Sequence, residues 1–389
     1  MAEQAQNDWD PRDAATLADQ SARYDEMRRR CPVAHSEYLN WSLFGHEDVT
    51  RVLNDHHTFS SVVSSHLSVP NGMDPPEHTG YRAIVDSYFS PQQMDAFEPA
   101  CREIAIDLVQ RLALGGETDL MAEFAQDFAL RVQSDFLGWP VALHEPLRRW
   151  IRKNREATLA RHKTTMDDLA FEFDGYIMAL LTERRAAGVD AADDITTSLV
   201  RTKLGGTLLT DKEIVSILRN WTVGELGTIA GCVGILVHYL AQRPELQQQL
   251  RDDASLLPAA IDEILRIDAP LIASRRITTA QVDIGGRSLA PGQRISLIWA
   301  SANRSEAVFG DPDTFRLDRD PAQNLLYGAG IHVCPGAPLA RMELRVVMEE
   351  LLARTVRIGL VPGRQPVKAA YPAGGFSVLP LQIEPLQLI

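Results

Sequence analysis

Apolar residues recur at intervals of three and four over most of this chain, which is the spacing that places them on one face of an α-helix. Polar residues fill the positions between them, as expected for helices that pack against a shared core. The pattern predicts helices over residues 47–53, 79–89, 94–114, 121–137, 169–187, 195–203, 211–242, 259–267 and 338–354. We therefore expect a mainly α-helical protein.

Alternating patterns typical of strands are fewer and lie mostly in the C-terminal half. Short strands are predicted over 282–284, 287–289 and 294–298, the first two joined by a Gly285-Gly286 turn. The tail over 371–389 alternates enough to predict one more hairpin. No repeat or linker divides the sequence, so we expect a large helical region and a small β-rich region in a single domain over 1–389.

The longest predicted helix, over 211–242, has a clear start and an unusual middle. Thr210 and Glu213 have the spacing of a capping box. Glycines then recur at three- and four-residue spacing, at Gly224, Gly227, Gly231 and Gly234. Each costs about 1 kcal/mol relative to alanine, and such a stripe lets a flat group or another backbone approach closely. Glu225 and Thr228 lie one turn apart on one face, which makes this segment a candidate functional site.

The composition narrows the possible partners. The chain has 39 basic and 52 acidic residues, a net charge of −13, which argues against nucleic acid as the main partner. Apolar residues make up 45% of the chain, enough for a large core. The N-terminus lacks the basic and apolar regions of a secretory signal, and the apolar stretch over 229–240 is too short to span a bilayer. We expect a soluble cytoplasmic protein.

The cysteines do not form a disulfide scaffold or a Cys-x-x-Cys pair, because Cys31, Cys101, Cys232 and Cys334 lie far apart. One of them has an unusual setting. Cys334 lies in the glycine-rich stretch 327–341, just before a predicted helix. A helix N-terminus lowers a thiol pKa, and backbone amides in such a loop can donate to the sulfur. A thiolate held in this way suits an axial ligand of heme iron.

At this point the sequence resembles the cytochrome P450 superfamily. The stretch 327–341 matches the heme-binding signature Phe-Gly-x-Gly-x-His/Arg-x-Cys-x-Gly-x-x-Leu-Ala at every fixed position but the first, where Tyr327 replaces phenylalanine. The resemblance implies heme b with Cys334 as axial ligand, His332 as a propionate partner, and Gly328 and Tyr327 beside the cofactor. It also implies the cytochrome P450 fold, with heme between the long central helix and the cysteine loop. A buried Tyr327 hydroxyl would need a partner.

Further motifs follow in the family's order. Within 74–82, His78 and Arg82 resemble the pair that contacts a heme propionate, and Arg276 resembles the strand arginine that does the same. Arg275 is an adjacent alternative to Arg276, pointing the other way on a strand. Glu263 and Arg266 resemble the Glu-x-x-Arg motif, which joins Arg319 in the family's structural triad.

The oxygen-activating segment departs from the family's Ala/Gly-Gly-x-Asp/Glu-Thr pattern. The family commonly places a proline about sixteen residues after the threonine, and Pro244 lies 244 − 228 = 16 after Thr228. Thr228 therefore matches the family's alcohol, Gly227 occupies the acid's position, and Glu225 stands where glycine is usual. Glu225 is a candidate proton-relay acid, a substrate anchor, or one side of a salt bridge away from the heme.

The resemblance implies a soluble monooxygenase that inserts one oxygen atom from O2 into a hydrophobic small substrate. The expected apolar lining comprises Val62, Val63, Leu67, Leu271, Ile272 and Phe376. No flavin or nicotinamide domain is apparent, so electrons are expected from a separate ferredoxin or flavodoxin with its reductase. Arg102, Arg341 and Arg345 are candidates for its docking face. A peroxide-driven peroxygenase on the same fold and a non-catalytic heme-thiolate ligand-binding protein are the alternatives.

Overall fold

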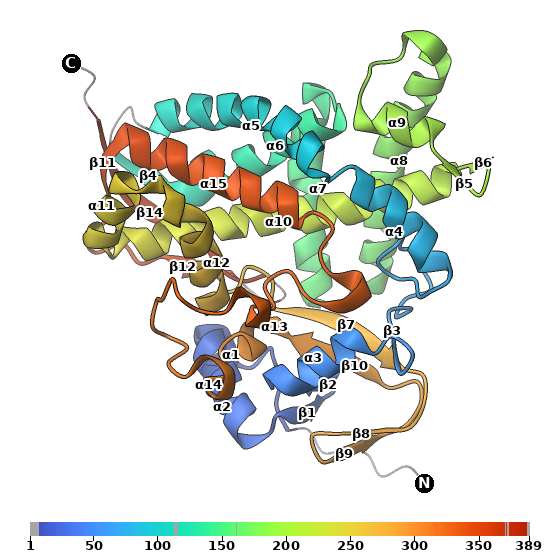
Figure 1. Ribbon diagram of the computed structural model, residues 1–389, viewed down its shortest axis with the longest axis horizontal. Helices are drawn as coiled ribbons and strands as arrows, with labels where there is room; N and C mark the ends of the chain where they lie inside the picture. The colour runs from blue at the N-terminus through green and yellow to red at the C-terminus, as the bar shows by residue number, and fades with distance from the viewer. Residues whose placement is uncertain (1–7, 113–115, 161, 370, 372, 387–389) are drawn as a thin grey trace.

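The computed structural model describes residues 8–112, 116–160, 162–369, 371 and 373–386. Long helices form one part of the molecule and a smaller region with most of the β-structure forms the other, at the top and bottom of Figure 1. The helices are α1 Ala14–Ala18, α2 Gln20–Arg30, α3 His46–Asn54, α4 Glu77–Ser87, α5 Pro91–Leu112, α6 Gln126–Leu137, α7 His144–Ala160, α8 Lys163–Ala187, α9 Ile195–Arg201, α10 Asp211–Ala241, α11 Pro244–Asp252, α12 Leu257–Ile267, α13 Trp299–Ala302, α14 Glu306–Phe309 and α15 Ala337–Arg354.

Each predicted helix has a counterpart, with differences at the ends. The helix predicted over 121–137 begins with a π-helical segment, Met121–Ala125, before α6. The one predicted over 195–203 ends at Arg201, because Lys203–Leu204 (β5) pairs with Thr207–Leu208 (β6). Positions 113 and 114 of the helix predicted over 94–114 lie outside the described residues.

Several helices were not predicted. Helix α11 was missed because Pro244 was read as the end of the preceding helix, whereas it occupies the first turn of a new one, where its missing N–H is not needed. Helices α2 and α7 were missed because charged residues interrupt their apolar positions.

The main sheet has five strands in the order β1 (Val33–Ser36), β2 (Asn40–Leu43), β10 (Arg294–Ile298), β7 (Ala273–Thr278) and β3 (Phe59–Ser60). The predicted hairpin of β8 (Val282–Ile284) and β9 (Arg287–Leu289) is confirmed. The third predicted strand is β10, which pairs with β7 in antiparallel register. Arg276 therefore lies on a central strand of this sheet.

The hairpin predicted in the tail is wrong. Strand β13 (Phe376–Val378) pairs with β12 (Val367–Lys368), while β14 (Pro380–Pro385) lies between β11 (Thr355–Leu360) and β4 (Gly116–Asp119). Only Leu379 separates β13 from β14, and one residue cannot form the two-residue turn of a tight hairpin. The tail's last positions, 387–389, lie outside the described residues.

Helix α10 runs through the core and begins with the predicted capping box. The Thr210 hydroxyl accepts from the Glu213 backbone N–H, and a Glu213 carboxylate oxygen accepts from the Thr210 N–H at 2.6 Å. Two of its glycines serve packing. A Cβ at Gly234 would lie 2.6 Å from the Met121 sulfur, and one at Gly231 would touch the backbone of Gly374. Gly224, by contrast, has open space beside it and lines the central cavity.

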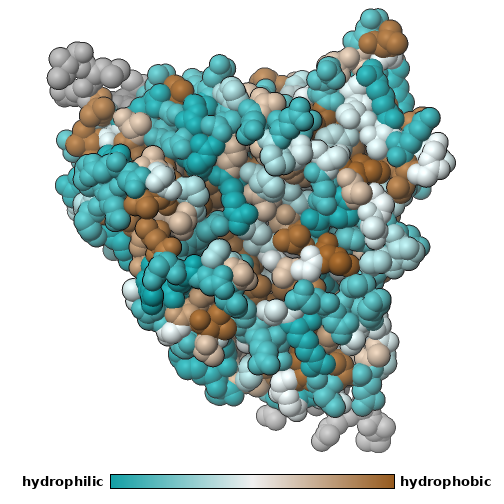
Figure 2. All heavy atoms as spheres, in the orientation of Figure 1, coloured by the Kyte–Doolittle hydropathy of each residue, from teal (hydrophilic) through white to brown (hydrophobic). Residues whose placement is uncertain are grey.

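Among the described residues, α10 is the helix that is long and apolar enough to cross a bilayer. In its most apolar window 61% of the residues are buried inside the protein, as in the core helix of a soluble fold. On the face of the molecule shown in Figure 2, hydrophilic residues predominate and hydrophobic ones form small scattered groups.

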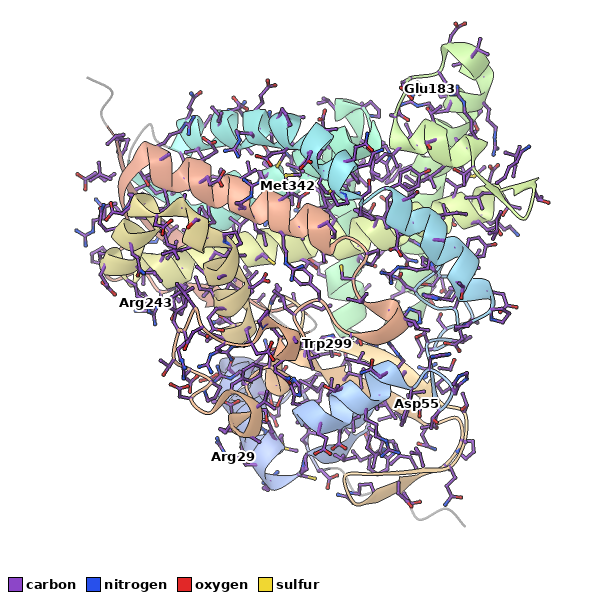
Figure 3. The ribbon with its side chains drawn as sticks, viewed as in Figure 1. Arg29, Asp55, Glu183, Arg243, Trp299 and Met342 are labelled. Carbon is purple, nitrogen blue, oxygen red and sulfur yellow. The ribbon has the colours of Figure 1, made fainter. Side chains whose placement is uncertain are left out.

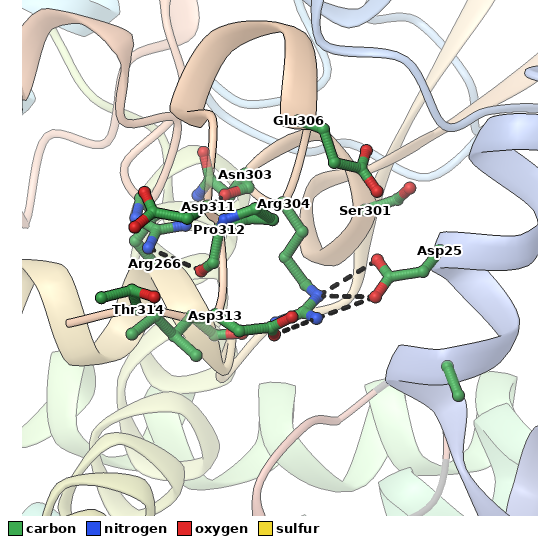
Figure 4. A network of polar contacts seen from close by, with 12 residues as sticks. Asp25, Arg266, Ser301, Asn303, Arg304, Glu306, Asp311, Pro312, Asp313 and Thr314 are labelled. Carbon is green, nitrogen blue, oxygen red and sulfur yellow. Dashed lines mark hydrogen bonds and ion pairs between the residues drawn. The ribbon is translucent and has the colours of Figure 1, made fainter.

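A polar network ties the loop after α14 to α2 and α12 (Figure 4). Arg304 donates to Asp25 at 2.8 Å and to Asp313 at 2.5 Å, while Arg266 donates to the carbonyl oxygens of Asn303 and Pro312, each at 2.8 Å. Each of these arginines is at most 7% exposed, so the loop is held by satisfied buried cations. The network fixes the loop that leads to Cys334.

Candidate active site

The cysteine loop is shaped by two glycines with left-handed backbone. Gly328 and Gly330 have φ values of 74° and 68°, a region in which side chains are strained. The Cys334 N–H donates to the Tyr327 carbonyl at 2.8 Å, which closes the loop, and α15 begins three residues after the cysteine. The loop therefore presents Cys334 to the cavity directly before a helix N-terminus.

The Cys334 thiol opens onto the cavity, which itself lies inside the protein. Burial raises the pKa of the thiol above its ordinary value, and the backbone amides of Gly336 and Ala337 act in the opposite direction. The amides at the start of α15 thus lower the thiol pKa as the sequence predicts, but in the protein alone desolvation is the larger effect and the net shift is upward. A bound metal cation reverses this balance, since a coordinating thiol loses its proton.

Tyr327 packs under Arg341, whose guanidinium carbon lies 4.4 Å from the ring centroid. Its hydroxyl is buried and has no hydrogen-bond partner among the described residues. Burial raises the Tyr327 pKa further above neutrality. The hydroxyl therefore stays neutral, but among the described residues it lacks the hydrogen-bond partner that a buried tyrosine is expected to have.

Positive or basic groups gather at one edge of the cavity. Its lining includes His78 and Arg82 from α4, Arg276 from β7 and His332 from the cysteine loop. The imidazole rings of His78 and His332 lie 4.4 Å apart, and the Nε2 atom of each is buried without a partner among the described residues. The structure thus brings together all four residues that the sequence assigned to heme propionates.

The two arginines at this edge of the cavity differ in their hydrogen-bond and ion-pair partners. Arg82 pairs with Asp86 at 2.6 Å and donates to the Ile331 carbonyl. Arg276 is 8% exposed, and among the described residues its one hydrogen bond is to the neighbouring carbonyl of Arg275, with no ion pair. Arg275, its neighbour on β7, is exposed and also borders the cavity. Burial lowers the Arg276 pKa, as expected for a cation without an anion.

The histidines at this edge are neutral in the protein alone. Burial lowers the pKa of His332 to about 3, with Arg276 and His78 adding repulsion, and it also lowers the pKa of His78. An uncompensated buried arginine and two unpartnered imidazoles form a cradle for an anion. The heme propionates that the family implies fit this chemistry.

The cavity has a volume of about 710 Å³ and extends from Cys334 to the middle of α10. Thr228 and Glu225 both line it, on the same side of α10 as Gly224. Of the predicted apolar lining, Val63 and Leu271 are present. The remaining assignments are wrong. Val62 and Leu67 are 51% and 42% exposed outside the lining, and Ile272 and Phe376 pack in the core instead.

Glu225 faces an acid that the sequence analysis overlooked. Glu343 on α15 is fully buried, and burial together with the nearby Glu225 raises its pKa. Among the described residues Glu225 makes no ion pair, so the salt-bridge alternative has no support. A signal for Glu343 was available, because it is a charged residue amid apolar positions in the helix predicted over 338–354.

The predicted triad is assembled. Glu263 accepts from Arg266 at 2.7 Å and from Arg319 at 2.9 Å, and the Arg316 backbone N–H donates to the same carboxylate. Glu263 and Arg266 are 5% and 1% exposed. This network joins α12 to the segment 316–319, which leads to the cysteine loop.

The predicted docking arginines are neutralised by acids. Arg102 pairs with Glu98, Glu349 and Glu350, and Arg345 pairs with Glu98 and Glu349. Arg341 pairs with Asp262 at 3.0 Å. The expected basic patch is therefore not present at these side chains, because each arginine lies in a balanced ion-pair cluster.

Comparison with known proteins agrees with this geometry. The family model described as Cytochrome P450 matches residues 151–384. The chain is 31% identical to "Cyclomarin C epoxidase CymV" of Salinispora arenicola, over 86% of this chain and 88% of the relative. It is also 31% identical to the "Erythromycin C-12 hydroxylase" of Saccharopolyspora erythraea, over 88% and 89%. The crystal structure of CYP109E1 from Bacillus megaterium with testosterone superposes with a TM-score of 0.82 at 28% identity, covering 96% of this chain and 99% of that one.

The chain belongs to the cytochrome P450 family. It is a monooxygenase of the bacterial type with the cytochrome P450 fold, and its cofactor is heme b with a cysteine ligand. The residues present fit that cofactor, because the loop cysteine, the buried Arg276 and the two unpartnered imidazoles of His78 and His332 line the same cavity.

Proposed function

We propose that Cys334 is the axial thiolate ligand and that His78, Arg82, Arg276 and His332 hold the heme propionates. The observation that carries the proposal is the buried Arg276, which has no anion among the described residues and shares the cavity with Cys334. Heme bound in this way supplies the activation of O2 for insertion of one oxygen atom into a substrate.

The protein's own groups prepare the cavity for this reaction. Gly328 and Tyr327 line the cavity beside Cys334. The left-handed backbone at Gly328 favours glycine, because a residue with a side chain would be strained there. Thr228 presents a hydroxyl to the cavity, and Glu225 presents a carboxyl one helical turn away. We assign these two groups to proton supply, which requires an acid close to neutral pKa. Burial raises the pKa of Glu225, as such a role requires.

The substrate we propose is a bulky, mainly apolar molecule with a few polar groups. Trp221, Leu271 and Ile229 supply apolar walls, while Ser61, Asn71 and Asn220 add polar atoms to the lining. A pocket of this kind orients an apolar ligand through a few hydrogen bonds. Relatives named for action on cyclomarin C and erythromycin support a substrate of that size class.

Electrons reach this domain, in our proposal, from a separate ferredoxin or flavodoxin with its reductase. We place the protein in the cytoplasm and treat 1–389 as one domain, which accords with a family match that spans helical and β regions alike. Arg102 and Arg345 already pair with acids of this chain. A docking partner would therefore have to replace these acids as ion-pair partners, or it would contact other side chains.

The test is an assay of the purified holoprotein with ferredoxin, ferredoxin reductase, NADPH and labelled O2 against a panel of macrolides, cyclic peptides and steroids. We expect a product that carries one labelled oxygen atom, with formation dependent on the reductase pair. Product formed with peroxide alone at an equal rate would favour a peroxygenase. Ligand-induced spectral shifts without any product across the panel would favour a non-catalytic binding protein.

A further inference from the structure

Arg275 on β7 borders the cavity and has no part in the site described above. Its side chain is exposed, whereas that of its neighbour Arg276 is buried. In the part of the chain that the structure describes, the Arg275 guanidinium donates no hydrogen bond and pairs with no acid. Arg82, by contrast, pairs with Asp86 at 2.6 Å. Arg275 is therefore a cation at the cavity that lacks an anion.

The charged side chains of the cavity lining are unevenly distributed. Among the described lining residues Glu225 on α10 is the one acid, whereas β7 contributes two cations, Arg275 and Arg276. His66, the remaining basic group outside the propionate cradle, pairs with Asp167 at 3.2 Å. The chain carries a net charge of −13, so the Arg275 guanidinium is a local positive site on an acidic protein. Such a site attracts anions to the cavity.

Arg275 and Arg276 are expected to bind different groups. Successive side chains of a strand point to opposite sides of the sheet. On the adjacent strand β10, Arg275 is paired with Ser296 and Arg276 with Ile295. Arg276 belongs to the propionate cradle, because burial lowers the pKa of His332 and repulsion from Arg276 adds to this effect. Arg275 therefore remains available to a second anion when the heme propionates are bound.

The lining next to Arg275 is apolar and reaches the surface. Ala273 lies two residues before Arg275 on β7 and therefore on the same side of the strand. Ala273, Leu271 and Val63 all line the cavity, and Leu271 is 44% exposed, so the lining meets solvent here. A ligand that enters at this point can place an anionic group against Arg275 and an apolar body in the cavity that leads to Cys334.

We propose that Arg275 binds a carboxylate of the substrate at the mouth of the cavity, so that the enzyme selects apolar molecules that carry one carboxylate. The planar fork of a guanidinium matches a carboxylate through two parallel hydrogen bonds. The inference rests on the proposed function, since it names the substrate class of the same cavity. Arg275 is a specificity-determining residue and takes no part in the oxygen chemistry.

The test is isothermal titration calorimetry of the heme-loaded protein with dodecanoate, dehydroabietate and cholate, each compared with its methyl ester. We expect the wild type to bind at least one of these acids more tightly than its ester, and added salt to reduce that preference. Arg275→Gln should weaken binding of that acid by roughly 3- to 10-fold and change binding of its ester by less than about twofold. Arg275→Lys should keep part of the preference, because the charge remains while the fork is lost.

The matched control is Arg294→Gln on the adjacent strand β10. The Arg294 side chain is exposed, donates to the Val63 carbonyl and is not part of the cavity lining. This variant loses the same charge close to the mouth, and we expect it to keep the wild-type ratio of acid to ester affinity.

The inference is overturned if the wild type binds none of the acids more tightly than its ester, or if Arg275→Gln leaves the ratio of the two affinities unchanged. Loss of heme from Arg275→Gln with an unchanged ratio would assign this arginine to a propionate and would also overturn the inference. Failure of the proposed function is read separately, as an absent thiolate-type carbon monoxide spectrum in the wild type.

Discussion

Buried glutamates occur in two regions of this protein, and their surroundings are opposite. Glu263 on α12 receives donors from Arg266, Arg319 and a backbone amide. Glu343 on α15 is also buried, and its neighbour is another acid, Glu225. The first environment stabilises an ionised carboxylate and therefore fixes structure. The second disfavours ionisation and holds a proton, which suits chemistry. Burial alone says little about the role of an acid, since its neighbours decide its charge.

The largest effect on stability is expected when the hydrogen-bonded network around Glu263 is broken. Replacement of Arg266 by methionine removes two hydrogen bonds to Glu263 and leaves a buried carboxylate with one cation fewer. We expect a loss of about 3–5 kcal/mol in the free energy of unfolding, measured with urea. The matched control is Arg111→Met, in an ion pair whose side chains are 64% and 41% exposed, for which we expect less than about 1 kcal/mol. Equal losses in the two variants would contradict the comparison.

Replacement of Glu225 and Glu343 should stabilise the protein instead of destabilising it, and the size of the effect depends on pH. The unfolded-state pKa of Glu225 is 4.5, and its folded-state value is raised to about 7. A raised folded-state pKa stabilises the protein below pH 4.5, and that contribution is lost as the pH rises toward 7. The wild type should therefore lose stability relative to the Glu225→Gln, Glu343→Gln double variant over this range, by up to about 1.4 kcal/mol per pH unit for one proton.

Thermal unfolding of both proteins at several pH values provides the measurement. A difference between wild type and double variant that stays constant across this range would show that folding does not raise the pKa values of the carboxyl pair.

Arg276 extends the comparison of buried charged groups to a cation. It is a buried cation without an anion, so it should depend on the heme propionate as Glu263 depends on Arg266. Arg276→Gln removes a charge-assisted hydrogen bond of about 1.5–3 kcal/mol, which corresponds to roughly 10- to 100-fold weaker heme retention. Transfer of heme to apomyoglobin measures this directly. A larger effect for Arg275→Gln would show that the neighbouring arginine is the propionate partner.

The smallest effect concerns a neutral group. The Tyr327 hydroxyl is buried without a partner among the described residues, whereas the ring packs against Arg341. Tyr327→Phe keeps the ring, restores the family's residue and removes an unsatisfied group, so we expect about 1 kcal/mol of added stability. A loss of stability on replacement would indicate that the hydroxyl has a partner in the heme-loaded protein.

The extent to which the sequence predicted this structure differs between local and long-range features. Helical periodicity and the capping box at Thr210 are local, and they placed the long helices within a few residues. The pairing of β14 with β4 joins segments 261 residues apart (380 − 119), and no local pattern encodes it. The tail hairpin failed for this reason.

The site shows the same division. Motif residues around Cys334 and His78 were identified because their spacing is local, and the structure places them in one cavity. Trp299 lies between the helical and β regions in Figure 3 and lines the cavity. Residue spacing in the sequence does not predict this position, because it depends on how distant segments pack together. Glu343 lies 118 residues from Glu225 (343 − 225), on the helix that carries Met342 (Figure 3), and only packing of α10 on α15 brings the two acids together.

The central claim is that the sulfur of Cys334 binds the heme iron as a thiolate. The most direct measurement is the absorption spectrum of the purified, heme-loaded protein after reduction and addition of carbon monoxide. We predict the red-shifted Soret band that thiolate ligation produces, and its loss in Cys334→His with heme still bound. A Soret band at the position typical of histidine-ligated heme in the wild type, or a red-shifted band that persists in Cys334→His, would contradict the account.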